Sequence, residues 1–472
     1  MGLFPVFEHW SDWLSQPRIK HTCYGVLIGL SLSYTTLSFT RYLNLRWQTR
    51  KRVSTFEPRP IELRSDEIVS GVTGLIGNTP LVRINSLSNA LGVEILGKAE
   101  FLNPGGSVKD RVALQMIEDA ERNGLLRPYT GSHIFEGTVG STGISIATIA
   151  RARGYDATII MPDDVAEEKV KALLALGAEV ERVRPASIVD KKQYVNLARQ
   201  RASKFAQEDP LDPSVFNTGV HSHTLPSTPS SVVVTTTADV DLDQSGWQKN
   251  EEFLSKPRGY FADQFENRSN FDAHFKGTGP EIWRQTSGRV GAFVSGAGTG
   301  GTVAGVGQYL KSVNPEVIVA ISDPDGSGLY NKVKYGVMYD RREAEGTKRR
   351  HQVDTVVEGI GINRLTNNIE LALPVIDDAF RITDEEAVAM SRYLVKNDGL
   401  FLGSSSACNL IACIKLVKKL GWKEGQHVVT ILCDSGSRHY SKFWNEDYLR
   451  NANIPIKLGL VEELLEKPLE NS

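Results

Sequence analysis

A single lysine stands where a predicted turn changes into a predicted helix. The turn is indicated by Asn-Pro-Gly-Gly at 103–106, and apolar residues recur at helical spacing after Ser107, a candidate cap. Lys109 would then lie in the first helical turn, where the helix dipole and a pocket of low dielectric both favour the neutral amine. A neutral amine can form a Schiff base with an aldehyde. On this stretch alone, a solvated surface lysine is the simpler interpretation.

A glycine-rich loop at 295–302 follows an apolar strand pattern and precedes a helical pattern. Glycines let backbone amides converge on an anion, and the start of a helix adds its dipole. The loop lacks the Lys-Ser/Thr ending of a P-loop, and we expect the later Asp323 to end a strand rather than bind a ribose. The loop therefore predicts a site for one phosphate rather than for a dinucleotide.

Two further loops are rich in hydroxyl groups. The loop at 136–143 lies between a strand and a helix, where it could receive a carboxylate. The serine run at 403–407 lies between two helical patterns, the second beginning at Asn409, and its simplest interpretation is a helix cap. Together with the lysine and the phosphate loop, these loops predict a cofactor with an aldehyde and one phosphate.

The order of apolar runs predicts how these loops are positioned. Strand patterns alternate with helical patterns, which favours parallel sheets covered by helices in two lobes. Ligands in such sheets bind beyond the carboxyl ends of the strands. The predicted strands are 94–99, 133–135, 157–161, 178–180, 290–294, 317–321 and 427–432, and the predicted helices include 108–123, 143–153, 166–176 and 303–311.

The motifs resemble those of the cysteine synthase family, also called O-acetylserine sulfhydrylase, among the fold-type II enzymes that use pyridoxal 5′-phosphate (PLP). The resemblance extends from about residue 71 to about residue 449. It implies an α/β fold like that of the tryptophan synthase beta chain, with two lobes of mainly parallel sheets covered by helices. The motifs that carry the resemblance are 75–82, 103–111, 263–267, 278–283, 295–302 and 358–361.

The resemblance implies a role for each matching position. Lys109 matches the lysine that holds PLP and moves the α proton of the substrate, and Ser405 matches the serine that faces the pyridine nitrogen. A neutral hydroxyl does not keep that ring protonated, so the ring is a weaker electron sink than one paired with an aspartate. The phosphate cradle matches Gly298, Thr299, Gly300, Gly301 and Thr302. The substrate side matches Thr138, Ser141, Thr142, Gln264 and Gly359.

Two positions depart from the family's pattern. Ser141 stands where the family has an asparagine beside the ring oxygen of the cofactor, and serine is shorter with a single donor. Ala407 stands where the family has a glycine, so its methyl could crowd the cofactor or strain a backbone of positive φ. These departures leave a cofactor-binding pseudoenzyme or scaffold at a membrane as a rival function.

The predicted reaction is β-replacement on an activated serine. The resemblance implies that O-acetyl-L-serine and sulfide give L-cysteine and acetate through a Lys109 aldimine and an aminoacrylate. The alternatives within enzymes are cystathionine beta-synthase, which takes homocysteine, and a desulfhydrase that releases sulfide from cysteine. The resemblance also implies a homodimer.

Composition excludes several other classes. The 472 residues are too many for one compact core, and 40% hydrophobic with 23% charged residues is ordinary for a globular protein. The 54 basic and 56 acidic residues do not suggest a nucleic-acid partner. The four cysteines have neither metal-ligand nor disulfide spacing, so we expect no metal site and a reducing compartment.

Residues 1–66 are predicted to form a membrane anchor and a linker. Residues 21–40 contain no Lys, Arg, Asp or Glu, and a helix of this length would span a bilayer core of about 30 Å. More basic residues follow this stretch than precede it, so the positive-inside rule places the catalytic domain in the cytosol. Such a single-pass anchor resembles those of the mitochondrial outer membrane, with the endoplasmic reticulum and a buried amphipathic helix as alternatives.

Residues 67–472 are expected to form the PLP-dependent catalytic domain. We place the smaller lobe at about 108–260 and the larger lobe at about 71–107 together with 261–450. The Ser/Thr/Pro-rich residues at about 217–250 predict a disordered surface insertion, with Val232–Val234 as a candidate edge strand.

Overall fold

The computed structural model describes residues 68–186, 188, 190–205, 256–340 and 355–466, together with a few isolated positions between 29 and 43. The chain divides into two compact units, Met1–Glu57 and Pro58–Ser472. The insertion predicted at about 217–250 lies outside the described residues, and so does the linker before residue 67. The second unit contains the elements that follow.

A six-stranded sheet forms the centre of this unit. Its strands lie in the order β1 (Leu81–Arg83), β2 (Glu94–Ala99), β10 (His427–Leu432), β7 (Ala292–Gly296), β8 (Ile318–Pro324) and β9 (Asp378–Ile382). Only the edge strand β1 is antiparallel to its neighbour. The inner strands are rich in Val, Ile and Ala and are almost wholly buried, as expected where helices cover both faces of a parallel sheet.

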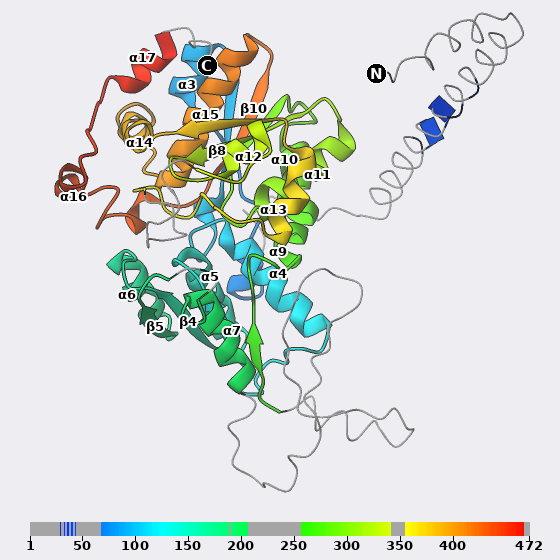
Figure 1. Cartoon of the computed structure of the whole chain (residues 1–472), viewed down its shortest axis with the longest axis vertical. Helices are drawn as coiled ribbons and strands as arrows, with labels where there is room; N and C mark the ends of the chain where they lie inside the picture. The colour runs from blue at the N-terminus through cyan, green and yellow to red at the C-terminus, as the bar shows by residue number, and fades with distance from the viewer. Residues whose placement is uncertain are drawn as a thin grey trace, which may run out of the picture. The chain divides into compact units, whose positions relative to one another are not determined.

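A second sheet has four strands, all parallel. Its order is β5 (Glu179–Val183), β4 (Asp156–Pro162), β3 (His133–Gly137) and β6 (Gly259–Phe261). Helices α5 (Ser141–Ala152), α6 (Glu167–Ala175) and α7 (Tyr194–Phe205) lie next to β4 and β5 (Figure 1). Neighbouring residues of one strand face different cores, because Ile159 belongs to the cluster around α5 whereas Ile160 belongs to the cluster around α7. These sheets confirm the predicted α/β fold, while the proposed lobe boundaries stay a prediction.

The remaining helices connect the strands and pack against one or other of the two sheets. They are α3 (Asn85–Leu91), α4 (Lys109–Arg122), α9 (Ser269–Ala273), α10 (Gly279–Gln285), α11 (Gly301–Val313), α12 (Leu329–Tyr335), α13 (Asn367–Ala372), α14 (Asp384–Asp398), α15 (Ser404–Leu420), α16 (Glu446–Asn451) and α17 (Leu460–Glu466). Short 3-10 turns occur at Val72–Leu75, Glu100–Leu102, Leu373–Val375 and Gly436–Arg438, and a π-helical turn at His274–Thr278 joins α9 to α10.

Helix α15 is the central helix of the larger core. Its residues from Ser404 to Ile414 are all buried, which is typical of a helix that is surrounded by other elements. The helix begins at Ser404 with Gly403 as N-cap, so the prediction that it starts near Asn409 is wrong. The serines bind neighbouring loops instead of capping: Ser404 Oγ accepts from Glu358 N at 3.1 Å, and Ser406 Oγ accepts from Cys433 N at 2.8 Å.

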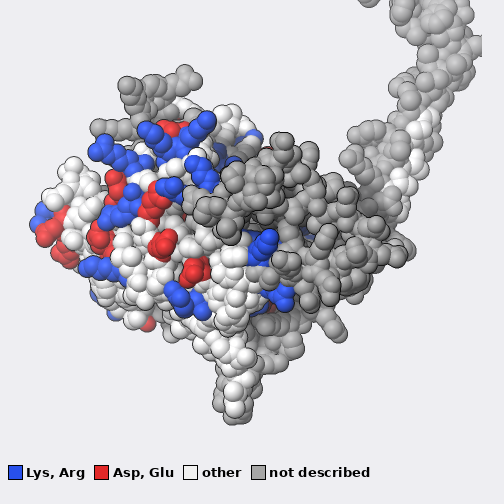
Figure 2. Space-filling model, turned by 90° about the horizontal axis from the view of Figure 1, so that it is seen from below, with Lys and Arg blue, Asp and Glu red and all other residues white. Residues whose placement is uncertain are grey.

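Charged side chains of both signs lie side by side on the part of one face that the structure describes (Figure 2). Exposed pairs on the described surface include Arg182 with Glu167 at 2.8 Å and Arg201 with Glu181 at 3.1 Å. Each such pair contributes at most about 1 kcal/mol to stability. The free energy of folding therefore comes mainly from the buried clusters.

The predicted localisation as a membrane-anchored protein is wrong. Among the residues that the structure describes, no helix is both long and apolar enough to cross a bilayer. Most of residues 21–40 lie outside the described part of the chain. The physical reason lies in the hydroxyl residues of the stretch, which dilute its apolar character; two of them, Thr36 and Thr40, bond the backbone carbonyls of Ser33 and Thr36.

Candidate functional site

A cavity of about 560 Å³ lies beyond the carboxyl ends of β3, β7 and β10. Its wall contains all but one of the predicted site residues: Lys109, Thr138, Ser141, Thr142, Gln264, Gly298, Thr299, Gly300, Thr302, Gly359 and Ser405. Gly301 is the exception, because it lies behind the wall as the first residue of α11. The structure thus brings four loops that are far apart in the sequence to one cavity.

Lys109 is the first residue of α4, and its side chain lines the cavity. The predicted serine cap is replaced by Val108 as N-cap, although Ser107 Oγ still accepts from Lys109 N at 3.3 Å. Removal from water lowers the pKa of Lys109, and the nearby Cys433 and Asp434 oppose this shift only in part. The amine is therefore neutral more often than that of an ordinary surface lysine, as a Schiff base requires.

The turn before Lys109 is held by one asparagine side chain. Asn103 Nδ2 donates to the backbone oxygens of Glu100 and Ser107 at 2.9 and 3.2 Å, while its Oδ1 accepts from Gly77 N at 2.8 Å. On the far side, Val108 N donates to the backbone oxygen of Cys433 at 3.0 Å. The lysine is thereby fixed relative to the ends of β2 and β10.

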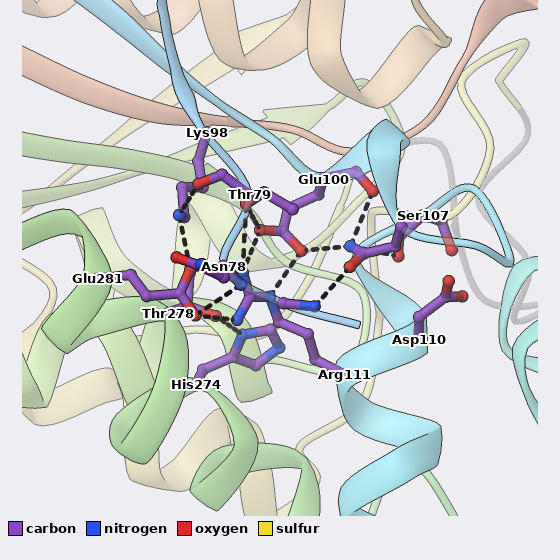
Figure 3. Close-up of polar contacts among 12 residues, drawn as sticks. Asn78, Thr79, Lys98, Glu100, Ser107, Asp110, Arg111, His274, Thr278 and Glu281 are labelled. Atoms are coloured by element: carbon purple, nitrogen blue, oxygen red, sulfur yellow. Dashed lines mark hydrogen bonds and ion pairs between the residues drawn. The ribbon is translucent and has the colours of Figure 1, made fainter. Parts of the chain in front are cut away.

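A buried network of four charged residues anchors α4 two residues beyond the lysine (Figure 3). Arg111 contacts Glu100 at 2.8 Å and Glu281 at 2.7 Å, and Lys98 contacts Glu281 at 2.6 Å. All four side chains are at most 8% exposed. Burial lowers the pKa of Arg111, but the two carboxylates outweigh it and raise the pKa above its ordinary value. The network therefore stays charged, and its charges cancel.

The glycine-rich loop approaches neighbouring residues too closely to carry side chains at two of its positions. A Cβ on Gly298 would lie 2.4 Å from the backbone oxygen of Gly359, and one on Gly301 would lie 2.1 Å from Asn270 Oδ1. Gly300 has φ of 90°, a left-handed conformation that favours glycine, and it is the N-cap of α11. The N-terminus of a 13-residue helix therefore opens on the cavity, where its amides and dipole suit one phosphate.

The substrate side of the cavity is built from α5 and the segment after β6. Thr142 Oγ1 donates to Gln264 Oε1 at 2.6 Å, which leaves the Gln264 amide nitrogen as a donor suited to a carboxylate. Ser141 begins α5 and lines the cavity, so a serine does replace the family's asparagine at the site. Ala407 does not line it: it lies inside α15 and is absent from the positive-φ residues.

Ionisable residues that we did not predict as site residues line the same cavity, among them Asp164, Lys169, Asp434, His439 and Lys442. Lys169 pairs with Glu358, and His439 Nε2 pairs with Asp434 Oδ2 at 2.9 Å. Burial opposes ionisation of Glu358, but Lys169, His439 and Lys442 hold its pKa at about 2. Asp434 could have been predicted, since it stands two residues after the strand at 427–432, whereas Lys169 and His439 show no local signal.

A family model described as "Pyridoxal-phosphate dependent enzyme" matches residues 72–225 and 230–434. The chain belongs to this family. It is 53% identical over 401 residues to "Cysteine synthase 2" of Schizosaccharomyces pombe, with 84% of this chain and 90% of that protein covered. It is 47% identical to "Putative mitochondrial cysteine synthase" of Saccharomyces cerevisiae, with 89% of this chain and 91% of that protein covered.

A similar solved structure is that of O-ureido-L-serine synthase. It superposes with a TM-score of 0.60 at 26% sequence identity and covers 84% of this chain and 100% of that protein. The cavity residues fit the cofactor that the family's description names: a lysine amine with a lowered pKa lies in one cavity with a helix N-terminus that is free of side chains. Lys109 would hold the aldehyde of PLP, and the start of α11 would hold its phosphate.

Proposed function

We propose that the chain is a PLP-dependent cysteine synthase that converts O-acetyl-L-serine and sulfide into L-cysteine and acetate. The observation that carries this proposal is the convergence of Lys109, the start of α11 and Ser405 on one cavity. It is supported by identities of 53%, 54% and 52% to proteins named cysteine synthase 2 from three fungi. A homodimer stays a prediction from the resemblance.

Each group has a place in the proposed chemistry. When bound, PLP supplies an aldehyde that condenses with amines and a ring that withdraws electrons. Lys109 Nζ, made less basic by burial, would take the α proton of the substrate and return it later. The Gln264 amide nitrogen would hold the substrate carboxylate, with Thr142 Oγ1 orienting that amide, and Ser405 would face the ring nitrogen without fixing a charge on it.

Sulfide is favoured over the other acceptors. The chain is 34% identical to "Cystathionine beta-synthase" of Rattus norvegicus, of which it covers 58%, and this is well below its identity to the cysteine synthases. Release of sulfide from cysteine remains an alternative for the same site, because its steps are of the same kind. The position of Ala407 outside the cavity wall removes one of the two reasons for considering a pseudoenzyme.

The test uses the full chain loaded with PLP. We expect O-acetyl-L-serine to change the visible absorbance of the bound cofactor, and sulfide then to restore it with release of cysteine. Lys109→Ala is the control, in which binding of PLP should lose its covalent component and turnover should fall by several orders of magnitude. Competition between sulfide and homocysteine identifies the acceptor. An unchanged absorbance in the wild-type enzyme would contradict the proposed reaction.

A further inference from the structure

His274 is a buried histidine that lies directly behind the phosphate loop. It begins the π-helical turn His274–Thr278, it is 0% exposed, and it lies close to Arg111 (Figure 3). Its Nδ1 lies 2.9 Å from Thr278 Oγ1, and its Nε2 lies 3.1 Å from Thr302 Oγ1. Thr302 is the second residue of α11 and lines the cavity. The histidine thus connects a buried threonine to a threonine of the cavity wall.

The ring of His274 is neutral. Burial lowers its pKa well below the ordinary value, the positive charges of Lys109 and Arg111 lower it further, and the charge of Glu281 opposes the shift only in part. A neutral imidazole has one N–H donor and one acceptor nitrogen. One of the two threonine hydroxyls must therefore donate to the ring, and the other must accept from it.

Thr278 decides which nitrogen carries the proton. Its side chain is 0% exposed, and among the described residues Nδ1 of His274 is the only partner of its hydroxyl. A buried hydroxyl needs an acceptor for its proton, so Thr278 Oγ1 donates and Nδ1 accepts. Nε2 then carries the hydrogen and donates to Thr302 Oγ1. The opposite tautomer would leave the proton of Thr278 without an acceptor.

The consequence for Thr302 is a hydroxyl proton that is free to point into the cavity. In the described part of the chain, His274 Nε2 is the only partner of Thr302 Oγ1. The same arrangement occurs at Thr299, whose Oγ1 accepts from Asn270 Nδ2 at 2.9 Å, and an amide nitrogen can only donate. Two hydroxyls at the start of α11 are thus held from behind as acceptors.

We propose that His274 is a positioning residue for the cofactor: it holds Thr302 so that this hydroxyl donates to the phosphate of PLP. The hydrogen bonds would run in one direction, from Thr278 through His274 and Thr302 to the phosphate. The inference rests on the proposed function and assigns a role to a residue that does not line the cavity. This role requires a ring with an acceptor nitrogen on one side and an N–H donor on the other. Among the side chains, only the neutral imidazole of histidine provides both.

The test compares PLP with pyridoxal, which keeps the aldehyde and the ring but lacks the phosphate. Dissociation constants are measured by titrating the full-length apoenzyme and following absorbance and fluorescence. We expect Thr302→Val to weaken the binding of PLP about 10- to 100-fold, because a hydrogen bond to a charged group is lost. His274→Leu should weaken this binding about tenfold. Pyridoxal should bind all variants within about twofold of the wild type.

Two further variants separate positioning from a general structural role. His274→Gln keeps a donor that can reach Thr302, so it should recover part of the PLP affinity. The double variant of His274→Leu with Thr302→Val should bind PLP no more weakly than Thr302→Val alone, because the histidine acts only through that hydroxyl. The proposal would be overturned if His274→Leu weakened the binding of PLP and of pyridoxal equally. It would also be overturned if the two single-variant losses of PLP affinity multiplied in the double variant.

The wild-type chain provides a test that does not depend on folding of the variants. In ¹⁵N NMR spectra of histidine-labelled holoenzyme, we expect an acceptor-type shift for Nδ1 of His274 and an N–H shift for Nε2. The reverse assignment would refute the proposed direction of the hydrogen bonds. If the wild-type apoenzyme did not prefer PLP to pyridoxal at all, the phosphate site and the proposed function would fail together. If the wild type preferred PLP to pyridoxal and His274→Leu left this preference unchanged, only the proposed role of the histidine would be contradicted.

Discussion

Lys98 illustrates how strongly burial can lower the pKa of one side chain. Its side chain is 0% exposed, and its ammonium contacts Glu281 Oε2 at 2.6 Å and Gln285 Oε1 at 3.0 Å as well as the backbone oxygen of Thr79. Burial nevertheless lowers its pKa to about 8, with the charge of Glu281 opposing the shift. The lysine is therefore charged at neutral pH at a cost that the carboxylate offsets only in part.

This cost predicts a pH dependence of stability. Between pH 8 and the ordinary lysine pKa of about 10.5, the unfolded chain binds more protons at Lys98 than the folded chain does, so its contribution to stability rises with pH. Relative to Lys98→Met, the wild type should gain about 1–3 kcal/mol across this window and nothing below it. Urea unfolding of both proteins at pH 7 and pH 10 measures the difference. A difference that stays the same at both pH values would contradict the lowered pKa.

The residues that form the site could be predicted from the sequence where a whole motif lies within one loop. The lysine stretch and the phosphate loop each combine a turn, a helix start and the reacting residue within ten positions, so the sequence alone shows their chemistry. Lys169 was not predictable, because its partner Glu358 is 189 positions away in the sequence. The pairing of His439 with Asp434 was not predictable either, because it follows no recognised local pattern. His274 was missed for the same reason, since its partner Thr302 lies on another helix.

Among the elements, the start of α11 is shaped by close contacts on both sides, one with backbone and one with a side chain. Gly298 lies against the backbone of Gly359, and Gly301 lies against Asn270. The loop after β7 and the loop that contains residues 358–361 therefore pack without side chains between them. Such a contact leaves no room for even one methyl group.

We expect Gly298→Ala to weaken binding of PLP. Its Cβ would lie 2.4 Å from the backbone oxygen of Gly359, so one of the two loops must move, at a cost of about 1–3 kcal/mol. Titration of the apoenzyme with PLP measures this loss. Gly459→Ala is the matched control, because no atom lies within 4 Å of the added methyl and the backbone φ is ordinary. Equal affinities of the two variants would show that the close approach is not needed.

The long apolar strands were predicted well, whereas the short ones were not. Predicted strands at 94–99 and 427–432 agree with β2 and β10 to the residue. The missed strands β1 and β6 have three residues each, too few to show an alternation, and β9 carries an aspartate and an arginine. Tertiary pairing, rather than local pattern, makes these segments strands.

For the whole molecule, Arg111 joins parts of the chain that are distant in sequence. Its guanidinium contacts Glu100 beside β2 and Glu281 on α10, while its own helix carries Lys109. The helix that presents the lysine is therefore attached to both segments by charge-assisted hydrogen bonds in a water-excluded region. The position of the reactive amine depends on the integrity of this junction.

We expect Arg111→Met to destabilise the fold by about 3–5 kcal/mol, because Glu100 and Glu281 would remain buried with one cation fewer. The midpoint of thermal or urea unfolding measures the change. Arg122→Met on the same helix is the control. Arg122 is 65% exposed and, among the described residues, pairs only with Asp119, so its removal should change stability by at most about 0.5 kcal/mol. Comparable losses in both variants would contradict the special role of the buried arginine.

The pairing of β2 with β10 also determines when the six-stranded sheet can form during protein synthesis. The two strands lie at opposite ends of the domain's sequence, and β10 separates β2 from the rest of its sheet. The four-stranded sheet, by contrast, uses strands from one continuous region between His133 and Phe261, so it can form during synthesis. The six-stranded sheet must wait until the last strand has left the exit tunnel, and until then β2 exposes an unpaired apolar edge. Nascent chains that stop before residue 427 would thus be natural substrates for chaperones, although most of the residues around the reactive lysine have already been made.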